Sequence, residues 1–236
     1  MTRRLRAQGG FTIVEVLVAT FILGIVVTGA LTMMQVVLRQ SRGVMERTDA
    51  ARHGRLGLDQ LTRQIRSQVC KDQFTRGLIS AGPNSISFYA DLGDGRTEGP
   101  SRRTLTYDPA KRRLTETVYK SLTAPPQTPA YGPTPFRKDV PILRDVVPDT
   151  DAADKPLPFF SYFAYETKNG KPTPTLPLPT AGALVPADLA RAALVRVRFK
   201  VRPSGASDDT FAVRMQDDVF FRNADPNAAR PDPTCN

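Results

Sequence analysis

Glu15 is the residue near the amino terminus whose chemistry most needs a partner. It is the only formally charged residue between Phe11 and Leu38, a run long enough to cross a bilayer, for which ~20 apolar residues suffice. A carboxylate at membrane depth costs a few kcal/mol unless it is paired or lies near the interface. If the chain began at Phe11, the nearest cation would be the new α-amino group, its own or a neighbouring subunit's. The alternative is a carboxylate resting among the lipid headgroups.

The ten residues before Phe11 are basic and end in two glycines. In an ordinary secretory signal the cleavage site follows the apolar core. Here the glycine pair precedes the apolar run, so a cut after Gly10 would remove the basic leader and keep the helix. The positive-inside rule places Arg3, Arg4 and Arg6 in the cytoplasm and sends the carboxyl-terminal bulk across the membrane.

The segment Gly10–Ala19, with the sequence GFTIVEVLVA, resembles the cleavage and methylation motif of type IV prepilins and type II secretion pseudopilins. The shared features are a basic leader, Gly before Phe, Glu four residues later and an uninterrupted apolar helix. The resemblance implies cleavage between Gly10 and Phe11 by a membrane aspartyl prepilin peptidase, and N-methylation of Phe11. It also implies that Glu15 contacts the Phe11 amine of a neighbouring subunit during assembly.

The remaining cysteine and histidine chemistry is sparse. Two cysteines, Cys70 and Cys235, exclude a multi-cysteine zinc or iron–sulfur site built within one chain. Outside the membrane they can form one disulfide, which we favour over two free thiols. The single histidine, His53, has no metal-spaced partners, so a surface or packing role is favoured. We expect neither a metal site nor a cofactor.

Acidic residues in the second half suggest other chemistry. Residues 91–95 (DLGDG) offer oxygen ligands but lack the spacing and terminal Glu of an EF-hand, so a β-turn is favoured over a calcium site. The Asp pairs at 208–209 and 217–218 are typical of solvated loops or strand edges. There is no G-x-S-x-G elbow, P-loop or H-E-x-x-H motif, so we expect no enzyme. A site assembled from Asp, Ser and Lys is the open alternative.

The chain is basic, with 33 Lys and Arg residues against 23 acidic ones and a net charge of +10. Removing the three leader arginines leaves +7. Such a charge favours anionic lipids, nucleic acid or acidic partners without selecting among them. Strand-face arginines are commonly solvated edges, but as candidate contacts to DNA phosphates we single out seven. These are Arg102, Arg103, Arg112, Arg113, Arg196, Arg198 and Arg202.

One long helix is expected to carry the amino-terminal motif. Residues 11–38 form its transmembrane part, and residues 39–70 continue it with apolar residues at helical spacing. That stripe consists of Val44, Thr48, Ala51, Leu58, Leu61, Ile65 and Val69, and it should pack on the head. Gly43, Gly54 and Gly57 weaken the helix by ~1 kcal/mol each relative to Ala and permit bending.

Residues 71–236 are expected to form a β-rich head. Alternating patterns predict strands at 85–90, 103–107, 112–119, 159–166, 193–201 and 210–220. Residues 108–111, beginning Asp-Pro, predict a hairpin turn between the second and third of these. The Pro-rich stretches 121–158 and 169–188 are expected to be surface loops.

The predicted fold is therefore α+β: a cleaved leader 1–10, a transmembrane helix 11–38, its amphipathic continuation 39–70, and a mainly antiparallel, pilin-like head. Size and element order resemble minor pilins and pseudopilins, especially the J-type pseudopilin and PilW-like pilins. This implies a non-catalytic subunit of a type IV pilus or type II secretion pseudopilus, at its tip or in assembly initiation. The implied partners are other subunits, prepilin peptidase, the membrane, and DNA or secreted cargo. A DNA-binding minor pilin of a competence pilus is the alternative.

Overall fold

The computed structural model describes residues 12–72, 76–92, 99–123, 127–168, 171–204, 211–222 and 235. The chain forms two compact units, Met1–Met45 and Glu46–Asn236. The first unit holds the first part of a long helix, and the second holds the rest of that helix and all the strands. The leader and the bond between Gly10 and Phe11 lie outside the described residues.

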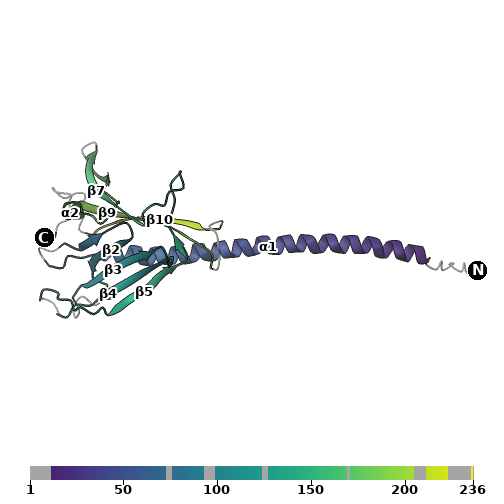
Figure 1. Ribbon diagram of the computed structural model, residues 1–236, viewed down its shortest axis with the longest axis horizontal. Helices are drawn as coiled ribbons and strands as arrows, with labels where there is room; N and C mark the ends of the chain where they lie inside the picture. The colour runs from purple at the N-terminus through teal and green to yellow at the C-terminus, as the bar shows by residue number, and fades with distance from the viewer. Residues whose placement is uncertain are drawn as a thin grey trace, which may run out of the picture. The chain divides into compact units, whose positions relative to one another are not determined.

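Helix α1, Ile13–Arg66, is the first element of the chain (Figure 1). We expected helix as far as residue 70, but the chain leaves it after Arg66. The Val69 N–H donates to the Tyr89 carbonyl, and the Asp91 N–H donates to the Ser67 carbonyl, at 2.9 and 3.0 Å. Residues 67–69 therefore run beside residues 89–91 as an extended segment, because these sheet-like bonds replace the last helical turn.

The first antiparallel sheet contains five strands in sequence order (Figure 1). They are β1 (Leu78–Ala81), β2 (Ser85–Ala90), β3 (Ser101–Asp108), β4 (Arg113–Tyr119) and β5 (Arg137–Arg144). The strands predicted at 85–90, 103–107 and 112–119 are thus confirmed as β2, β3 and β4.

The predicted turn between β3 and β4 is also confirmed. The Asp108 side chain accepts hydrogen bonds from the backbone N–H groups of Ala110 and Lys111, at 3.0 and 3.1 Å. This is the local bonding for which Asp is favoured at the start of a turn. The backbone hydrogen bond from Lys111 lowers the pKa of the Asp108 carboxyl, with the Lys111 side chain adding to the effect.

The second sheet has the strand order β10-β9-β7-β8, and β6 pairs with β9. Its members are β6 (Val146–Val147), β7 (Phe160–Lys168), β8 (Lys171–Pro177), β9 (Ala192–Val201) and β10 (Val213–Phe220). Three predicted strands are confirmed as β7, β9 and β10, although β10 begins at Val213 and Thr210 lies outside the described residues. The α+β fold, a long apolar helix followed by antiparallel sheets, is confirmed.

The prediction that 121–158 and 169–188 form only loops was wrong. These stretches contain β5, β6 and β8, and helix α2, Pro186–Arg191, begins in the second of them. Pro141 lies in β5, and β8 contains Pro172, Pro174 and Pro177. Both strands occupy sheet edges, where the missing proline N–H needs no ladder partner. Proline at the start of α2 is equally compatible with a helix, because the first N–H has no intrahelical acceptor.

Aromatic side chains form the centre of the head's core. The Phe159 ring lies 4.9 Å from the Tyr107 ring and 5.1 Å from the Phe199 ring, measured between centroids. Leu61 and Ile65 of α1 are fully buried in the same cluster. The Tyr107 hydroxyl donates to the Val146 carbonyl at 3.2 Å, and burial raises the pKa of Tyr107 to about 12. The core therefore joins both sheets to the last turns of α1.

Two helix glycines set the distance between α1 and the sheets. A Cβ on Gly57 would overlap the Leu143 side chain, and one on Gly54 would lie 2.8 Å from Met215 Cε. The predicted stripe is correct at Leu61 and Ile65, which are fully buried, whereas its first members are exposed. We expected these glycines to permit bending. Their observed role is close packing, because an added Cβ would displace the Leu143 or Met215 side chain.

We expect Gly57→Ala to destabilise the head by about 2 kcal/mol, because overpacking a filled core outweighs Ala's better helix propensity. Denaturant unfolding of the full chain, followed by tyrosine near-ultraviolet circular dichroism, measures the change. Gly182→Ala is the matched control, since nothing lies within 4 Å of its added methyl group. If Gly57→Ala were as stable as the native chain, Leu143 would be moving aside at little cost.

Candidate functional site

Within the described residues, the first part of α1 presents an exposed apolar surface. Its large apolar side chains from Ile13 to Leu38 are exposed, and the most apolar 18-residue window has a mean hydropathy of 2.4 with none of it buried. By length and composition α1 can cross a membrane. Soluble monomers rarely expose so large a contiguous apolar surface, so lipid or other apolar helices are its natural surroundings.

Threonine hydroxyls within this apolar stretch are satisfied inside the helix. Each of three threonine hydroxyls donates to backbone carbonyls three or four residues earlier, at 2.8–3.1 Å. Thr20 donates to the carbonyls of Val16 and Leu17. Thr28 donates to the Gly24 carbonyl, and Thr32 donates to the carbonyls of Thr28 and Gly29. A hydroxyl that bonds to the preceding turn leaves no unsatisfied donor facing hydrocarbon. These threonines are therefore compatible with a membrane span.

The start of α1 is a side-chain cap that includes Glu15. Thr12 directly precedes the helix, and its Oγ1 accepts a hydrogen bond from the Glu15 backbone N–H at 3.3 Å. The spacing T-x-x-E is that of a capping box. Glu15 therefore stands in the first turn, where the helix dipole favours a carboxylate. Its side chain also leans toward the amino terminus, as all helical side chains do.

Gly10 and Phe11, the proposed cleavage and methylation positions, lie outside the described residues. In the sequence, Phe11 precedes the capping threonine by one residue and Glu15 by four. The described geometry therefore starts the helix at Ile13, on the carboxyl side of the proposed cut, and puts Glu15 in the first turn.

The predicted arginines divide between the two sheets. On β3, the Arg102 guanidinium lies 4.0 Å from the Tyr119 ring centroid, and Arg103 is paired with the buried Glu116. Arg113 begins β4, and within the described residues its buried Nε has no hydrogen-bond partner. Arg112 ends the preceding turn with a positive φ of 49°.

The arginines of the second sheet are also engaged. Arg196 forms two hydrogen bonds to Asp218, at 2.6 and 2.7 Å, and Arg198 donates to Gln216 at 3.0 Å. The Arg202 backbone N–H donates to the Asp145 backbone carbonyl at 2.9 Å. Carboxylates thus neutralise two of the seven cations, Arg103 and Arg196. DNA contact stays a prediction from the sequence.

The two cysteines meet in the structure as a disulfide. Cys70, just beyond α1, is bonded to Cys235, with Cα atoms 5.9 Å apart and 165 residues of separation. The separation of the Cα atoms lies in the normal range for such bonds. The bond would hold the carboxyl terminus beside the segment that pairs with residues 89–91.

The other candidate groups are His53 and the acidic residues of the second half of the chain. His53 is exposed and lines a pocket of about 470 Å³ with Asp49, Arg144 and Asp145. Within the described residues, no three His, Cys, Asp or Glu side chains are placed to hold a metal ion. Asp217 accepts a hydrogen bond from Thr62, and Asp218 pairs with Arg196. The Asp pair at 208–209 and residues 93–95 lie outside the described residues.

Comparison with known proteins identifies only the amino-terminal region. Residues 5–31 match the family model described as the prokaryotic N-terminal methylation motif. Neither the curated proteins nor the solved structures contain a match to this chain. The matched residues include the second half of the leader, Gly10, Phe11, Glu15 and the first turns of the apolar helix. The amino-terminal region is thus type IV prepilin-like, and the chain continues with a helix that can span a membrane and with an antiparallel β head.

Proposed function

We propose that this chain is a minor subunit of a type IV pilus or a type II secretion pseudopilus. It is made as a precursor, cut between Gly10 and Phe11, methylated at Phe11 and incorporated through α1. The observation that carries the proposal is the methylation motif at the start of a capped helix whose apolar stretch is exposed. In this function the chain acts by assembling with other subunits and catalyses no reaction.

Membrane insertion and assembly use the same apolar surface. Before cutting, the basic leader holds the amino terminus in the cytoplasm and the head crosses the membrane. In lipid, the exposed side chains of α1 are solvated by acyl chains. In a filament, the same side chains pack against the helices of other subunits, so transfer between the two surroundings costs little hydrophobic free energy.

The head supports a specialised role over that of an abundant filament builder. It combines two sheets with proline-bearing edge strands, Pro141 in β5 and three prolines in β8. Prolines at exposed edges discourage strand addition by further copies. A disulfide from Cys70 to Cys235 would secure the terminus of such a head. We place the subunit at the filament tip or in assembly initiation, where one copy suffices.

Processing tests the proposal directly. We expect the native chain, co-expressed with a prepilin peptidase, to begin at a methylated Phe11, whereas Gly10→Val stays uncut because a branched side chain blocks the cleavage position. Intact-mass spectrometry and amino-terminal sequencing of the membrane fraction give both results.

Gly9→Val is the matched control, since it alters the neighbouring glycine and should leave the Phe11 terminus intact. A native chain that keeps Met1 in the presence of an active peptidase, or a Gly10→Val chain that still begins at Phe11, would refute the assignment.

A further inference from the structure

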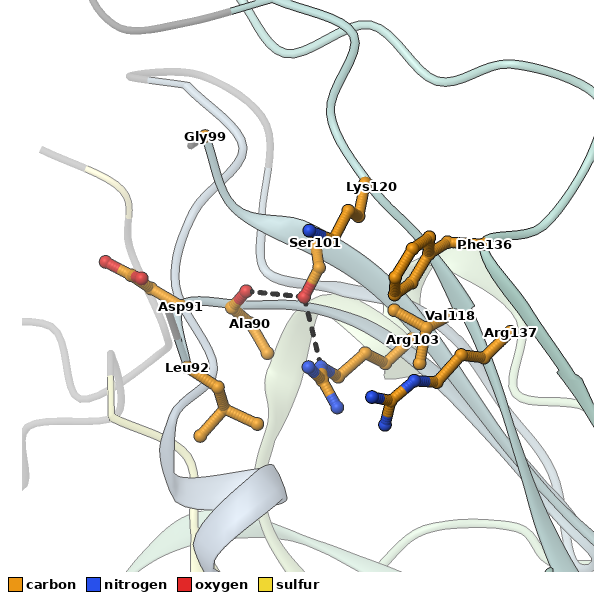
Figure 2. A pocket seen from close by; sticks show the side chains of 10 residues that line it. All are labelled: Ala90, Asp91, Leu92, Gly99, Ser101, Arg103, Val118, Lys120, Phe136 and Arg137. Carbon is orange, nitrogen blue, oxygen red and sulfur yellow. Dashed lines mark hydrogen bonds between the residues drawn. The ribbon is translucent and has the colours of Figure 1, made fainter. Parts of the chain in front are cut away.

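A pocket of about 290 Å³ opens at one end of the first sheet, in the second unit (Figure 2). Arg103 of β3, Val118 of β4 and Arg137 of β5 are direct cross-strand partners in register. Because partners on adjacent strands project from the same face, the two arginines flank Val118 on the face that elsewhere forms the core. Figure 2 shows both guanidinium groups turned toward the same space.

Arg103 is held in a fixed position. Its Nε donates to Ser101 Oγ at 3.0 Å, and the Ser101 hydroxyl donates to the Ala90 carbonyl at 3.0 Å, as the dashed lines in Figure 2 show. Its Nη1 donates to Glu116, whose side chain is 5% exposed. Two acceptors, Ser101 and Glu116, therefore orient the guanidinium before any ligand arrives, which reduces the entropy lost on binding.

The other two cations of the pocket, Lys120 and Arg137, lie near the Phe136 ring. The Lys120 ammonium lies 4.5 Å from its ring centroid and the Arg137 guanidinium 5.7 Å. Both distances suit cation–π attraction. Within the described part of the chain, no carboxylate forms a salt bridge with Arg137, although Glu116 does so with Arg103. Arg137 thus keeps its charge available at the mouth of the pocket.

The charges and apolar surfaces together select a ligand class. The pocket is lined by three cations, Arg103, Lys120 and Arg137, and by one carboxylate, Asp91. Glu116 lies outside the lining but neutralises Arg103, so one net positive charge remains at the pocket. A monoanion balances it, whereas a phosphate dianion would meet repulsion from both carboxylates. Phe136, 58% exposed, supplies an uncovered apolar surface beside the cations.

We infer that this pocket binds a peptide carboxylate that has an apolar group beside it, presented by a partner protein. The carboxylate accepts hydrogen bonds from Arg137 and from the free edge of the Arg103 guanidinium, and the apolar group packs on Phe136 and Val118. Planar guanidinium groups match a carboxylate in geometry and give charge-assisted bonds. The site is separate from processing and assembly, which use the amino-terminal helix.

N-acetyl-phenylalanine is the probe, because it joins a carboxylate to an aromatic group, and N-acetyl-phenylalanine amide is its neutral counterpart. Titration of each into the detergent-solubilised full chain, followed by calorimetry, should show millimolar or tighter binding of the acid and at least tenfold weaker binding of the amide. Arg137→Gln should weaken acid binding at least tenfold and leave amide binding unchanged. Arg144→Gln, at the exposed opposite end of β5, should bind the acid as the native chain does.

Several outcomes would overturn the site. These are equal binding of acid and amide, no binding of either, an unchanged affinity in Arg137→Gln, or inorganic phosphate binding more tightly than the acid. Lys120→Gln provides a second variant on the same ring and should weaken acid binding several-fold. Because the readout is equilibrium binding to the purified chain, failure here leaves Phe11 processing and filament incorporation untouched.

Discussion

Glu15→Gln should leave the chain inserted in the membrane and cut at Phe11, yet reduce its incorporation into filaments about a hundredfold. If Glu15 pairs with the Phe11 amine of a neighbouring subunit in apolar surroundings, removing the Glu15 charge leaves that amine unpaired, which costs about 3 kcal/mol. Since each 1.4 kcal/mol is tenfold, the loss is roughly two orders of magnitude. Glutamine has the size of glutamate and keeps a hydrogen-bonding oxygen, so the substitution tests the effect of the charge alone.

Quantitative immunoblots of sheared filaments against membranes, in a strain that makes the filament, provide the measurement. Glu46→Gln is the matched control, because Glu46 is also an exposed acid of α1 but lies beyond the apolar stretch. It should be incorporated normally. Equal incorporation of Glu15→Gln and the native chain would contradict the pairing and leave Glu15 as a carboxylate among the headgroups.

The Thr12→Ala variant separates the effect of the Glu15 charge from the effect of the helix cap that positions Glu15. The Thr12 side chain caps the backbone of Glu15 and not its carboxylate. Loss of a cap costs about 1 kcal/mol of helix stability, so incorporation should fall much less than in Glu15→Gln. An equally large loss would mean that the helix start, and not the charge, governs incorporation.

The parts that the sequence predicted well are those whose signal is local. An apolar run with one charge identifies α1, because the pattern depends on neighbours a few residues apart. The hairpin at 108–111 was equally readable, since Asp108 bonds to N–H groups two and three residues later. Strands β2, β3 and β4 alternate clearly enough to be recognised. Strand β1, only four residues long, has too few positions to alternate.

The parts that could not be predicted depend on contacts between distant residues. Gly57 meets Leu143, and no pattern within the helix reveals that close approach. Pro141 forbids a central strand, but only the strand order shows that β5 is an edge. The pocket beside Arg103 also depends on contacts between residues that are distant in the sequence. Its Arg137 lies in a stretch expected to be loop, and cross-strand register with Val118 is what brings the two arginines together.

The second large effect is expected from the bond between Cys70 and Cys235. Cys70→Ser should destabilise the head by about 5 kcal/mol, because the chain-entropy model gives that value for a loop longer than 100 residues. The pair is 165 residues apart, so the closed loop includes both sheets. Denaturant unfolding of the full chain in detergent, with tyrosine near-ultraviolet circular dichroism as the signal, measures the loss.

Three comparisons make this result specific to the bond. Cys235→Ser and the double variant should lose the same free energy as Cys70→Ser, because removing either sulfur removes the whole cross-link and the effects cannot add. Reductant should lower the stability of the native chain to that of the variants and leave the variants unchanged. Two free thiols would instead give small, additive losses, no response to reductant, and labelling of both cysteines in the unreduced, denatured mature chain. With a bond present, neither cysteine labels until it is reduced, and the carboxyl terminus is then released from the segment that follows α1.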